Sequence, residues 1–267
     1  MIVERITEYL EGVDRVVSET LLEHVRESCA YAFSRQFMER EAGDGRLRLS
    51  SSGHCLRKLA YALHRFEKKG KEIDARAMVN FFYGDVIELM VVNLALLAGC
   101  DLRNVGMEQM TVKTVIAGTK IEGHPDGLYI ENGETYLLEI KSMNDFQFRD
   151  FEKGTIESSY LAQVNMYMET LNLTSALFIA VNKQNGVMKE QIVAYSAVLG
   201  EQLRHDLESV LISTPDNLPE RLCAAGLSGK LPWQATYCPY WGHCFPEAER
   251  VVEKGRYALR IKTGDMP

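Results

Sequence analysis

The chain has 267 residues, 46% of them hydrophobic and 7 of them proline, so it can bury a full core and is expected to form one large globular domain with appendages. Its net charge of −7 makes the whole molecule unfavourable for nucleic acid, so such a partner must meet a local basic patch. Six scattered cysteines, charges within residues 1–10 and no apolar run near the roughly 20 residues of a membrane span predict a cytoplasmic protein without signal peptide or membrane contact.

Apolar residues at helical spacing predict an N-terminal helical segment over residues 3–40, which ends at Gly43-Asp44-Gly45. Two more helices are predicted near 55–66 and 75–97. After Gly99 the pattern changes to alternating and β-branched residues. It then predicts three strands that form a meander, over 107–116, 119–130 and 135–141.

The second half of the chain continues this mixed pattern. It predicts, in chain order, a helix over 160–171, strands over 175–181 and 187–195, and a helix over 197–212. The tail from Pro215 onward is expected to be irregular. The chain is therefore divided into an N-terminal helical segment (1–50), a core (51–215) and a C-terminal tail that closes on the core (216–267).

One window of the chain is rich in positive charge. Residues 46–76 contain nine Lys and Arg against three acidic residues. Within this window, Arg57, Lys58 and Arg65 are candidates for gripping the phosphates of a nucleic acid, a contact that weakens steeply with salt. A solvated helical face accounts for the same charges equally well.

Residues 123–141 carry the most informative pattern. Asn132-Gly133 between two alternating runs predicts a type I′ hairpin, because both central residues of this turn need positive φ. With these two residues as the loop, Asp126 lies opposite Glu139, with their Cβ atoms about 5 Å apart. Lys141 shares the face of Glu139 because side chains alternate along a strand.

Two facing carboxylates repel each other, so the hairpin predicts a cation between Asp126 and Glu139. Hard divalent cations prefer such oxygen ligands. The alternative is an exposed hairpin face on which Lys141 simply pairs with Glu139. Apolar residues on the same face favour a covered site; they are Leu128, Ile130 and Leu137.

The combination of Gly123-x-x-Asp126 with Glu139-Ile140-Lys141 resembles the PD-(D/E)XK nuclease superfamily. Upstream, Gly84-Asp85-Val86-Ile87-Glu88 resembles the glycine-x-x-x-histidine motif of its RecB-like branch, with Glu88 in the place of histidine.

Two further segments match the same branch. Gln163 and Tyr167 fit its Q-x-x-x-Y motif, in which both residues lie one turn apart on one helix face. The segment from Cys55 to Tyr61 resembles the one that opens RecB-like and CRISPR-associated RecB-like exonucleases. The matching features keep the family's order and reach from Cys55 to Cys244.

The resemblance implies an α/β fold with a central mixed β-sheet flanked by helices, the restriction-endonuclease-like core, preceded by the N-terminal helical segment. It also implies a Mg²⁺ or Mn²⁺ cofactor. The implied ligands are carboxylates and one backbone carbonyl, namely Glu88, directly or through water, Asp126, Glu139 and the carbonyl of Ile140.

The resemblance also assigns roles to three side chains outside the metal shell. Lys141 would orient or activate the attacking water and balance charge on the scissile phosphate. Gln163 would hold Lys141 or the nucleic acid backbone, and Tyr167 would pack beneath.

The activity implied is that of a metal-dependent deoxyribonuclease, an exonuclease that processes the ends of single- or double-stranded DNA in recombination or repair. The chain has no G-x-x-x-x-G-K helicase motif, which fits a stand-alone, phage-encoded enzyme. One alternative is a structure-specific or restriction-type endonuclease. Another is a catalytically silent DNA-binding subunit, against which the intact Asp126, Glu139 and Lys141 argue.

Many RecB-like nucleases close their fold with a four-cysteine iron-sulfur cluster. In this chain Cys55 takes the first position of that motif, and Cys238 and Cys244 take the last two. The remaining position falls on Ala235, so three thiolates are present where four are usual.

Three interpretations of these cysteines stay open. An iron-sulfur cluster would take its fourth ligand from Cys223, His243 or a group outside the chain. A zinc ion would be completed by His243 or His54. In a degenerate motif the thiols would only pack beside Trp233 and Trp241. Each interpretation predicts that the tail brings Cys238 and Cys244 near Cys55.

Overall fold

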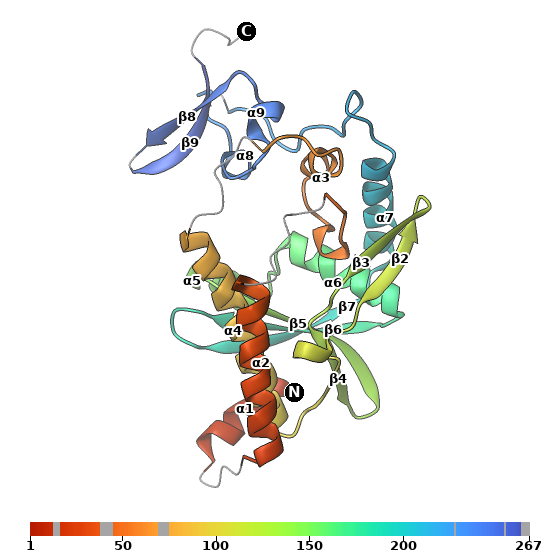
Figure 1. Ribbon diagram of the computed structural model, residues 1–267, viewed down its shortest axis with the longest axis vertical. Helices are drawn as coiled ribbons and strands as arrows, with labels where there is room; N and C mark the ends of the chain where they lie inside the picture. Colours follow the sequence, from red (N-terminus) through yellow and green to blue (C-terminus); the bar gives the residue numbers. More distant parts are fainter. Residues whose placement is uncertain (13–16, 38–44, 69–74, 227, 254, 263–267) are drawn as a thin grey trace. The chain divides into compact units, whose positions relative to one another are not determined.

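The computed structural model describes residues 1–12, 17–37, 45–68, 75–226, 228–253 and 255–262 (Figure 1). The chain forms two compact units. The first unit contains Met1–Ala42, Arg48–Gly53 and Ala75–Leu203, and the second contains Gly43–Leu47, His54–Asp74 and Arg204–Pro267.

A five-stranded mixed sheet forms the centre of the first unit, in the order β1-β4-β5-β6-β7. Strands β5 and β6 run parallel, and the other neighbours are antiparallel. The strands are β1 (Asp101–Arg103), β4 (Gly127–Glu131), β5 (Glu134–Met143), β6 (Ser175–Asn182) and β7 (Met188–Ala194). The mixed sheet predicted from the sequence is thus confirmed.

Helices cover both faces of this sheet. On one face, α1 (Ile2–Glu11) and α4 (Ala75–Leu97) share a core with Leu138, Ile140 and Leu177 of the sheet. On the opposite face lie α5 (Asp145–Glu152) and α6 (Ser158–Leu171), whose Phe151 and Tyr160 have ring centroids 5.6 and 6.0 Å from that of Phe178 on β6.

Three further helical elements accompany the first unit. Helix α2 (Glu19–Phe37) runs alongside α4 (Figure 1). The short 3-10 turn η1 (Leu49–Ser51) precedes a helix, and η2 (Gly106–Glu108) precedes a strand. Helix α7 (Ala197–Leu211) starts in the first unit and ends in the second. The predicted helices over 75–97, 160–171 and 197–212 are confirmed to within two residues.

The predicted meander is wrong. The single strand expected over 119–130 is divided into β3 (Thr119–Gly123) and β4, because Pro125 has no backbone N–H to continue a ladder. Strand β3 pairs with β2 (Val112–Ile116) in a separate two-stranded ribbon, and β1 takes the place beside β4.

The tail is more regular than predicted. In the second unit, α3 (Leu56–Leu63) is followed much later in the chain by α8 (Trp233–Thr236), α9 (Trp241–Cys244) and a hairpin of β8 (Ala248–Glu253) with β9 (Arg256–Ile261). Charged residues interrupt both six-residue strands, so their alternation is weak in the sequence. The predicted break at Gly43-Asp44 lies outside the described residues.

Helix α4 is the one helix, among the described residues, that is long and apolar enough to cross a membrane. Its C-terminal half is core, since Val91, Val92 and Ala95 are buried against the sheet. Its N-terminal half presents large apolar side chains such as Val79, Phe81 and Tyr83 to solvent.

Gly123, the first residue of the Gly123-x-x-Asp126 motif, lies against Tyr167 of α6. A Cβ at this position would be 2.5 Å from Cε1 of Tyr167 and 2.9 Å from Cβ of Leu49. Tyr167 is fully buried and cannot move aside. Only glycine therefore allows α6 to pack this closely on the end of β3.

Gly123→Ala is expected to destabilise the protein by about 1–3 kcal/mol, the usual cost of overpacking a rigid core. Gly84→Ala is the matched control, because Gly84 lies within α4 and its Cβ would be 3.9 Å from the nearest atom. We expect that change to stabilise by about 0.5–1 kcal/mol through the gain in helix propensity. Urea unfolding measures both, and equal midpoints for the two variants would contradict the packing argument.

Candidate active site

The β4–β5 hairpin has the register predicted from its turn. Asn132 and Gly133 have φ of 54° and 84°, as a type I′ turn requires. Gly127 pairs with Leu138 and Glu131 with Glu134. One residue beyond the Gly127–Leu138 pair, the same register places Asp126 opposite Glu139.

Asp126 is buried directly before β4 begins. Its Oδ2 accepts a hydrogen bond of 2.7 Å from the backbone N–H of Ile140. The backbone pairing of β4 and β5 stops at Gly127–Leu138, and beyond it the Asp126 carboxylate, in place of a backbone carbonyl, accepts the hydrogen bond from Ile140. This contact fixes the Asp126 charge beside the next strand.

Glu139 is fully buried in the middle of β5. Its Oε1 accepts a hydrogen bond of 2.8 Å from Nε2 of Gln163, and the same carboxylate forms an ion pair with Lys141. Its Oε2 is buried and has no hydrogen-bond partner among the described residues. Burial first, and the charge of Asp126 second, raise the pKa of Glu139 to about 7.

Lys141 is the part of this cluster that solvent reaches, with 23% of its side chain exposed. Its ammonium lies 5.6 Å from the ring centroid of Tyr160. Burial alone would lower the pKa of Lys141, but the carboxylates of Glu139 and Asp126 outweigh it and raise that pKa. Lys141 therefore stays protonated.

Helix α6 supplies three residues to the site. Gln163 donates a hydrogen bond to Glu139, whereas the resemblance implied that it holds Lys141 or the nucleic acid backbone. Tyr167 lies one turn further and donates a hydrogen bond of 3.3 Å to the carbonyl of His124, beneath the site as expected. The sequence reasoning missed Tyr160, although its position one turn before Gln163 on the same helix was a usable signal.

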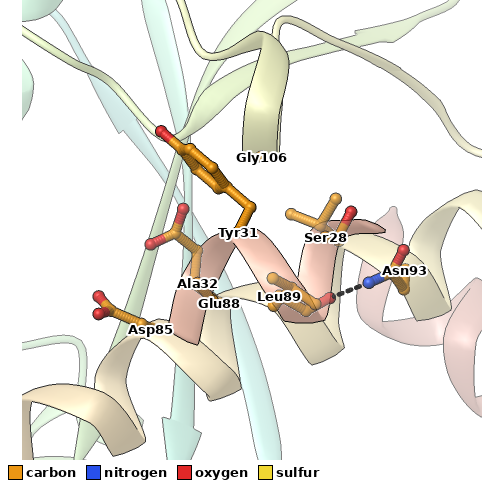
Figure 2. Close-up of a pocket in the computed structure, with 9 residues that line it drawn as sticks. Ser28, Tyr31, Ala32, Asp85, Glu88, Leu89, Asn93 and Gly106 are labelled. Carbon is orange, nitrogen blue, oxygen red and sulfur yellow. Dashed lines mark hydrogen bonds between the residues drawn. The ribbon is translucent and has the colours of Figure 1, made fainter. Parts of the chain in front are cut away.

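Glu88 lies on α4, in the first unit. It lines a small pocket between α2 and α4, and Figure 2 shows its carboxylate and that of Asp85 on the same side of α4, near Tyr31. Across the residues that the structure describes, no group of three or more His, Cys, Asp or Glu side chains is arranged to hold a metal ion. No such group joins Glu88 to Asp126 and Glu139 among the described residues, so the role of Glu88 as a ligand stays a prediction.

The pair of Asp126 and Glu139 fits a divalent cation in its chemistry. Mg²⁺ is usually held by one or two carboxylates while waters and substrate phosphates fill its other positions, so a third protein side chain is not required. The buried and unpartnered Oε2 of Glu139 is an oxygen that such an ion would satisfy.

The predicted phosphate-binding residues lie in the second unit. Arg57 donates hydrogen bonds to the hydroxyl of Tyr61 at 3.2 Å and to the carbonyl of Pro219 at 2.9 Å, so part of its donor capacity is used inside the protein. Lys58 is half-buried and Arg65 is exposed. Lys69 and Lys71 of the same basic window lie outside the described residues.

The cysteines of the predicted cluster gather in the second unit. The thiols of Cys238 and Cys244 each interact electrostatically with that of Cys55, as the sequence predicted, and Cys223 interacts with Cys55 and Cys238. Burial raises the pKa of Cys244 to about 11 and also raises that of Cys238.

Aromatic contacts hold the segments of these cysteines together. The ring centroid of Tyr61 lies 5.5 Å from that of Tyr240 and 5.7 Å from that of His243. His243 also bonds through Nε2 to the carbonyl of Glu67 at 2.8 Å, so Nδ1 is the ring nitrogen left for a metal ion. Cys223, which matches no motif position but was one candidate for the fourth ligand, interacts with Cys55 and Cys238.

No protein-family model matches the chain, and no curated protein matches it in sequence. Several solved structures resemble it at low identity. The structure of SSO0001 matches with a TM-score of 0.48 and 14% identity, over 82% of this chain and 94% of that one. The alkaline exonuclease LHK-Exo from Laribacter hongkongensis matches with a TM-score of 0.46 and 17% identity, over 62% of this chain and 86% of that one. LHK-Exo in complex with dAMP matches with a TM-score of 0.44 and 18% identity, over 68% and 84%.

The raised pKa of Glu139 predicts how stability depends on pH. Between the ordinary carboxyl value of 4.5 and about 7, folded Glu139 binds a proton that the unfolded chain has lost. The free energy of unfolding of metal-free protein should therefore fall as pH rises through this window, by about 1.4 kcal/mol per pH unit from this group. Glu139→Gln removes that part of the slope.

Urea unfolding at several pH values, with chelator present, measures the difference between wild type and Glu139→Gln. Carboxyl groups distant from Glu139 contribute equally to both proteins and cancel in that difference, which therefore reports the interacting pair of Glu139 and Asp126. Identical pH profiles would show that Glu139 titrates normally.

Proposed function

We propose that the first unit is a metal-dependent deoxyribonuclease that hydrolyses phosphodiester bonds at the site of Asp126, Glu139 and Lys141. The observation that carries the proposal is the buried carboxylate of Glu139, which faces Asp126, is tied to Lys141 and keeps one oxygen without a partner. A purely structural ion pair would not need a second carboxylate beside it.

Asp126 and Glu139 would hold a Mg²⁺ or Mn²⁺ ion, with the carbonyl of Ile140 and Glu88 as further ligands that the sequence resemblance suggests. When bound, such an ion lowers the pKa of a coordinated water and stabilises charge on the phosphate. The hydrogen bond from Ile140 N–H and that from Gln163 hold the two carboxylates in position beforehand.

Lys141 would act as a fixed positive charge. Because its pKa is raised, it does not accept a proton near neutral pH. Its ammonium, partly open to solvent beside Tyr160, would instead orient the attacking water and stabilise negative charge on the scissile phosphate. Arg57, Lys58 and Arg65 would add phosphate contacts from the second unit.

Between the two modes of cleavage, we favour an exonuclease that works on DNA ends in recombination or repair, as the sequence resemblance suggests. A structure-specific or restriction-type endonuclease is the alternative. Linear DNA and the same DNA as a closed circle, each with Mn²⁺, separate them: an exonuclease degrades only the linear form, and a catalytically silent subunit degrades neither.

Asp126→Asn, Glu139→Gln and Lys141→Met are expected to lower cleavage by about 100-fold or more, while Glu134→Gln on the exposed end of the same strand leaves it unchanged. Thermal melting with Mn²⁺ gives an independent readout. The ion should stabilise wild type and Lys141→Met, but not Asp126→Asn or Glu139→Gln.

Glu88→Gln belongs in the same melting series. A smaller Mn²⁺-induced shift than in wild type would support Glu88 as a ligand, directly or through water, and an unchanged shift would remove it from the site. Full cleavage by Glu139→Gln would overturn the proposed active site as a whole.

We also propose that Cys55, Cys223, Cys238 and Cys244 together bind an iron-sulfur cluster, with Cys223 in the role of the absent motif cysteine. The mutual electrostatic interactions of these thiols support the proposal. The described side chains do not form a ready-made metal site, so a cluster would draw the four thiols together when it binds, and a zinc ion on the same thiols is the alternative.

Protein purified without oxygen should then contain iron and sulfide and show the visible absorbance of thiolate-bound iron. We expect Cys223→Ser to lose both signals as completely as Cys238→Ser. Cys29→Ser, which changes an exposed cysteine in the first unit, should keep them. Colourless, iron-free wild-type protein would contradict the proposal.

A further inference from the structure

The second unit contains a cleft of about 720 Å³ that plays no part in the chemistry proposed above. Its walls come from the segment before α8, from α8 and from β9, all within the tail. Three of its lining residues are aromatic: Trp233, Tyr237 and Tyr257. Its size lies in the usual range of binding clefts.

These three aromatic side chains are unusually open to solvent. Trp233 is 67% exposed, Tyr237 71% and Tyr257 51%, although rings of this size are normally buried on average. Trp233 and Tyr237 lie one turn apart, with Tyr237 N–H bonded to the carbonyl of Trp233 at 3.1 Å. They therefore project from the same side of the chain.

The wall behind the rings is built firmly. Leu231 and Ala258 line the cleft and are buried, and Leu231 belongs to a core that includes Phe245 and Leu259. Leu231 N–H bonds to the carbonyl of Leu259 at 2.9 Å, so the segment before α8 extends the β8–β9 hairpin. Figure 1 shows α8 beside this hairpin, with which it is in contact. Exposed rings on such a support lose little entropy when they bind a flat partner.

Lys230 and Glu253 line the cleft, and the residues next to them on the hairpin add Arg250 and Arg260 against Glu249, so three cations stand against two anions in a chain that is acidic overall. Lys230 and Arg260 both bind the carboxylate of Glu253, so two cations share one anion. Arg250 adds a third cation, with its guanidinium 5.5 Å from the ring centroid of Tyr257. A polyanion is the partner that complements this rim.

We infer that this cleft binds a single-stranded segment of DNA, whose unpaired bases stack on Trp233, Tyr237 and Tyr257 while its phosphates meet Lys230, Arg250 and Arg260. Aromatic rings combined with cations are how proteins bind single strands without reading their sequence. The choice of DNA as the polymer rests on the proposed nuclease function. Binding itself depends only on the cleft and is measured without catalysis.

The chain offers a direct probe, because it has only two tryptophans. Trp241→Phe leaves Trp233 as the single tryptophan, which can be excited selectively over the tyrosines, and keeps a ring under Arg250. It also removes a buried indole N–H that has no partner among the described residues. The measurement uses this variant of the full chain, with chelator present so that no DNA is cleaved.

Titration with an oligothymidylate should quench Trp233 fluorescence to saturation, with an affinity that falls steeply as salt rises. An abasic oligonucleotide of equal length carries the same phosphates without bases and should quench little. A blunt duplex, whose bases are stacked within the helix, should also quench little.

Tyr237→Ala and Tyr257→Ala should each weaken binding about 10-fold, the usual effect of removing one stacking partner. Glu253→Gln should tighten it, because it removes the anion that occupies Lys230 and Arg260. Phe146→Ala is the matched control: it removes a 76% exposed ring from α5 in the first unit and should change nothing.

Equal quenching by the abasic strand, unchanged affinity in both tyrosine variants, or no quenching at all would overturn the inference. The last result would leave the cleft to a different class of partner, such as a peptide. Quenching without any cleavage by wild-type protein in Mn²⁺ would instead contradict the proposed nuclease function and leave this binding site standing.

Discussion

The arrangement of the site in the first unit depends on one carboxylate that water cannot reach. Glu139 is fully buried in the central strand of the sheet, where an unpaired charge would cost several kcal/mol. The ammonium of Lys141 and the amide of Gln163 offset part of that cost, whereas the facing Asp126 adds to it. The balance leaves Glu139 partly protonated near neutral pH and ready to gain from a cation. Such unrelieved electrostatic strain in an otherwise well-packed core is typical of functional sites.

Helix α6, whose Gln163 donates a hydrogen bond to the buried Glu139, is positioned by packing against Gly123 and not by an ion pair. Gly123 lets Tyr167 approach the end of β3, and this contact positions α6 so that Gln163 reaches Glu139. The two short motifs, Gly123-x-x-Asp126 and Gln163-x-x-x-Tyr167, are therefore one packing arrangement. Together the two motifs fix both the backbone and the hydrogen bonds of the site, which neither motif would do alone.

The chemistry of the chain is divided between its two units. The carboxylates and Lys141 lie in the first unit, on regular strands that hold side chains precisely. The basic residues, the four thiols and the exposed aromatic rings lie in the second, on short helices, turns and a small hairpin. The proposed nuclease function would use both kinds of surface, because bond cleavage requires fixed geometry whereas holding a flexible strand requires distributed, non-specific contacts.

The sequence by itself determined the register of the β4–β5 hairpin. A type I′ turn at Asn132-Gly133 admits only one pairing, and alternation along β5 then places Lys141 with Glu139, so local backbone chemistry sufficed. The long periodic helices, such as 75–97, were predictable for the same reason.

Only the tertiary structure decided features that depend on contacts distant in sequence. These include the separate ribbon of β2 and β3, the pocket of Glu88 beside α2, and the gathering of Cys223 with the other thiols. Strands as short as β8 and β9 also lack a clear local pattern and are stabilised by the partners they find. Periodicity and turn chemistry act within a few residues, whereas the choice of partner strand or neighbouring helix depends on the free energy of the whole packed core.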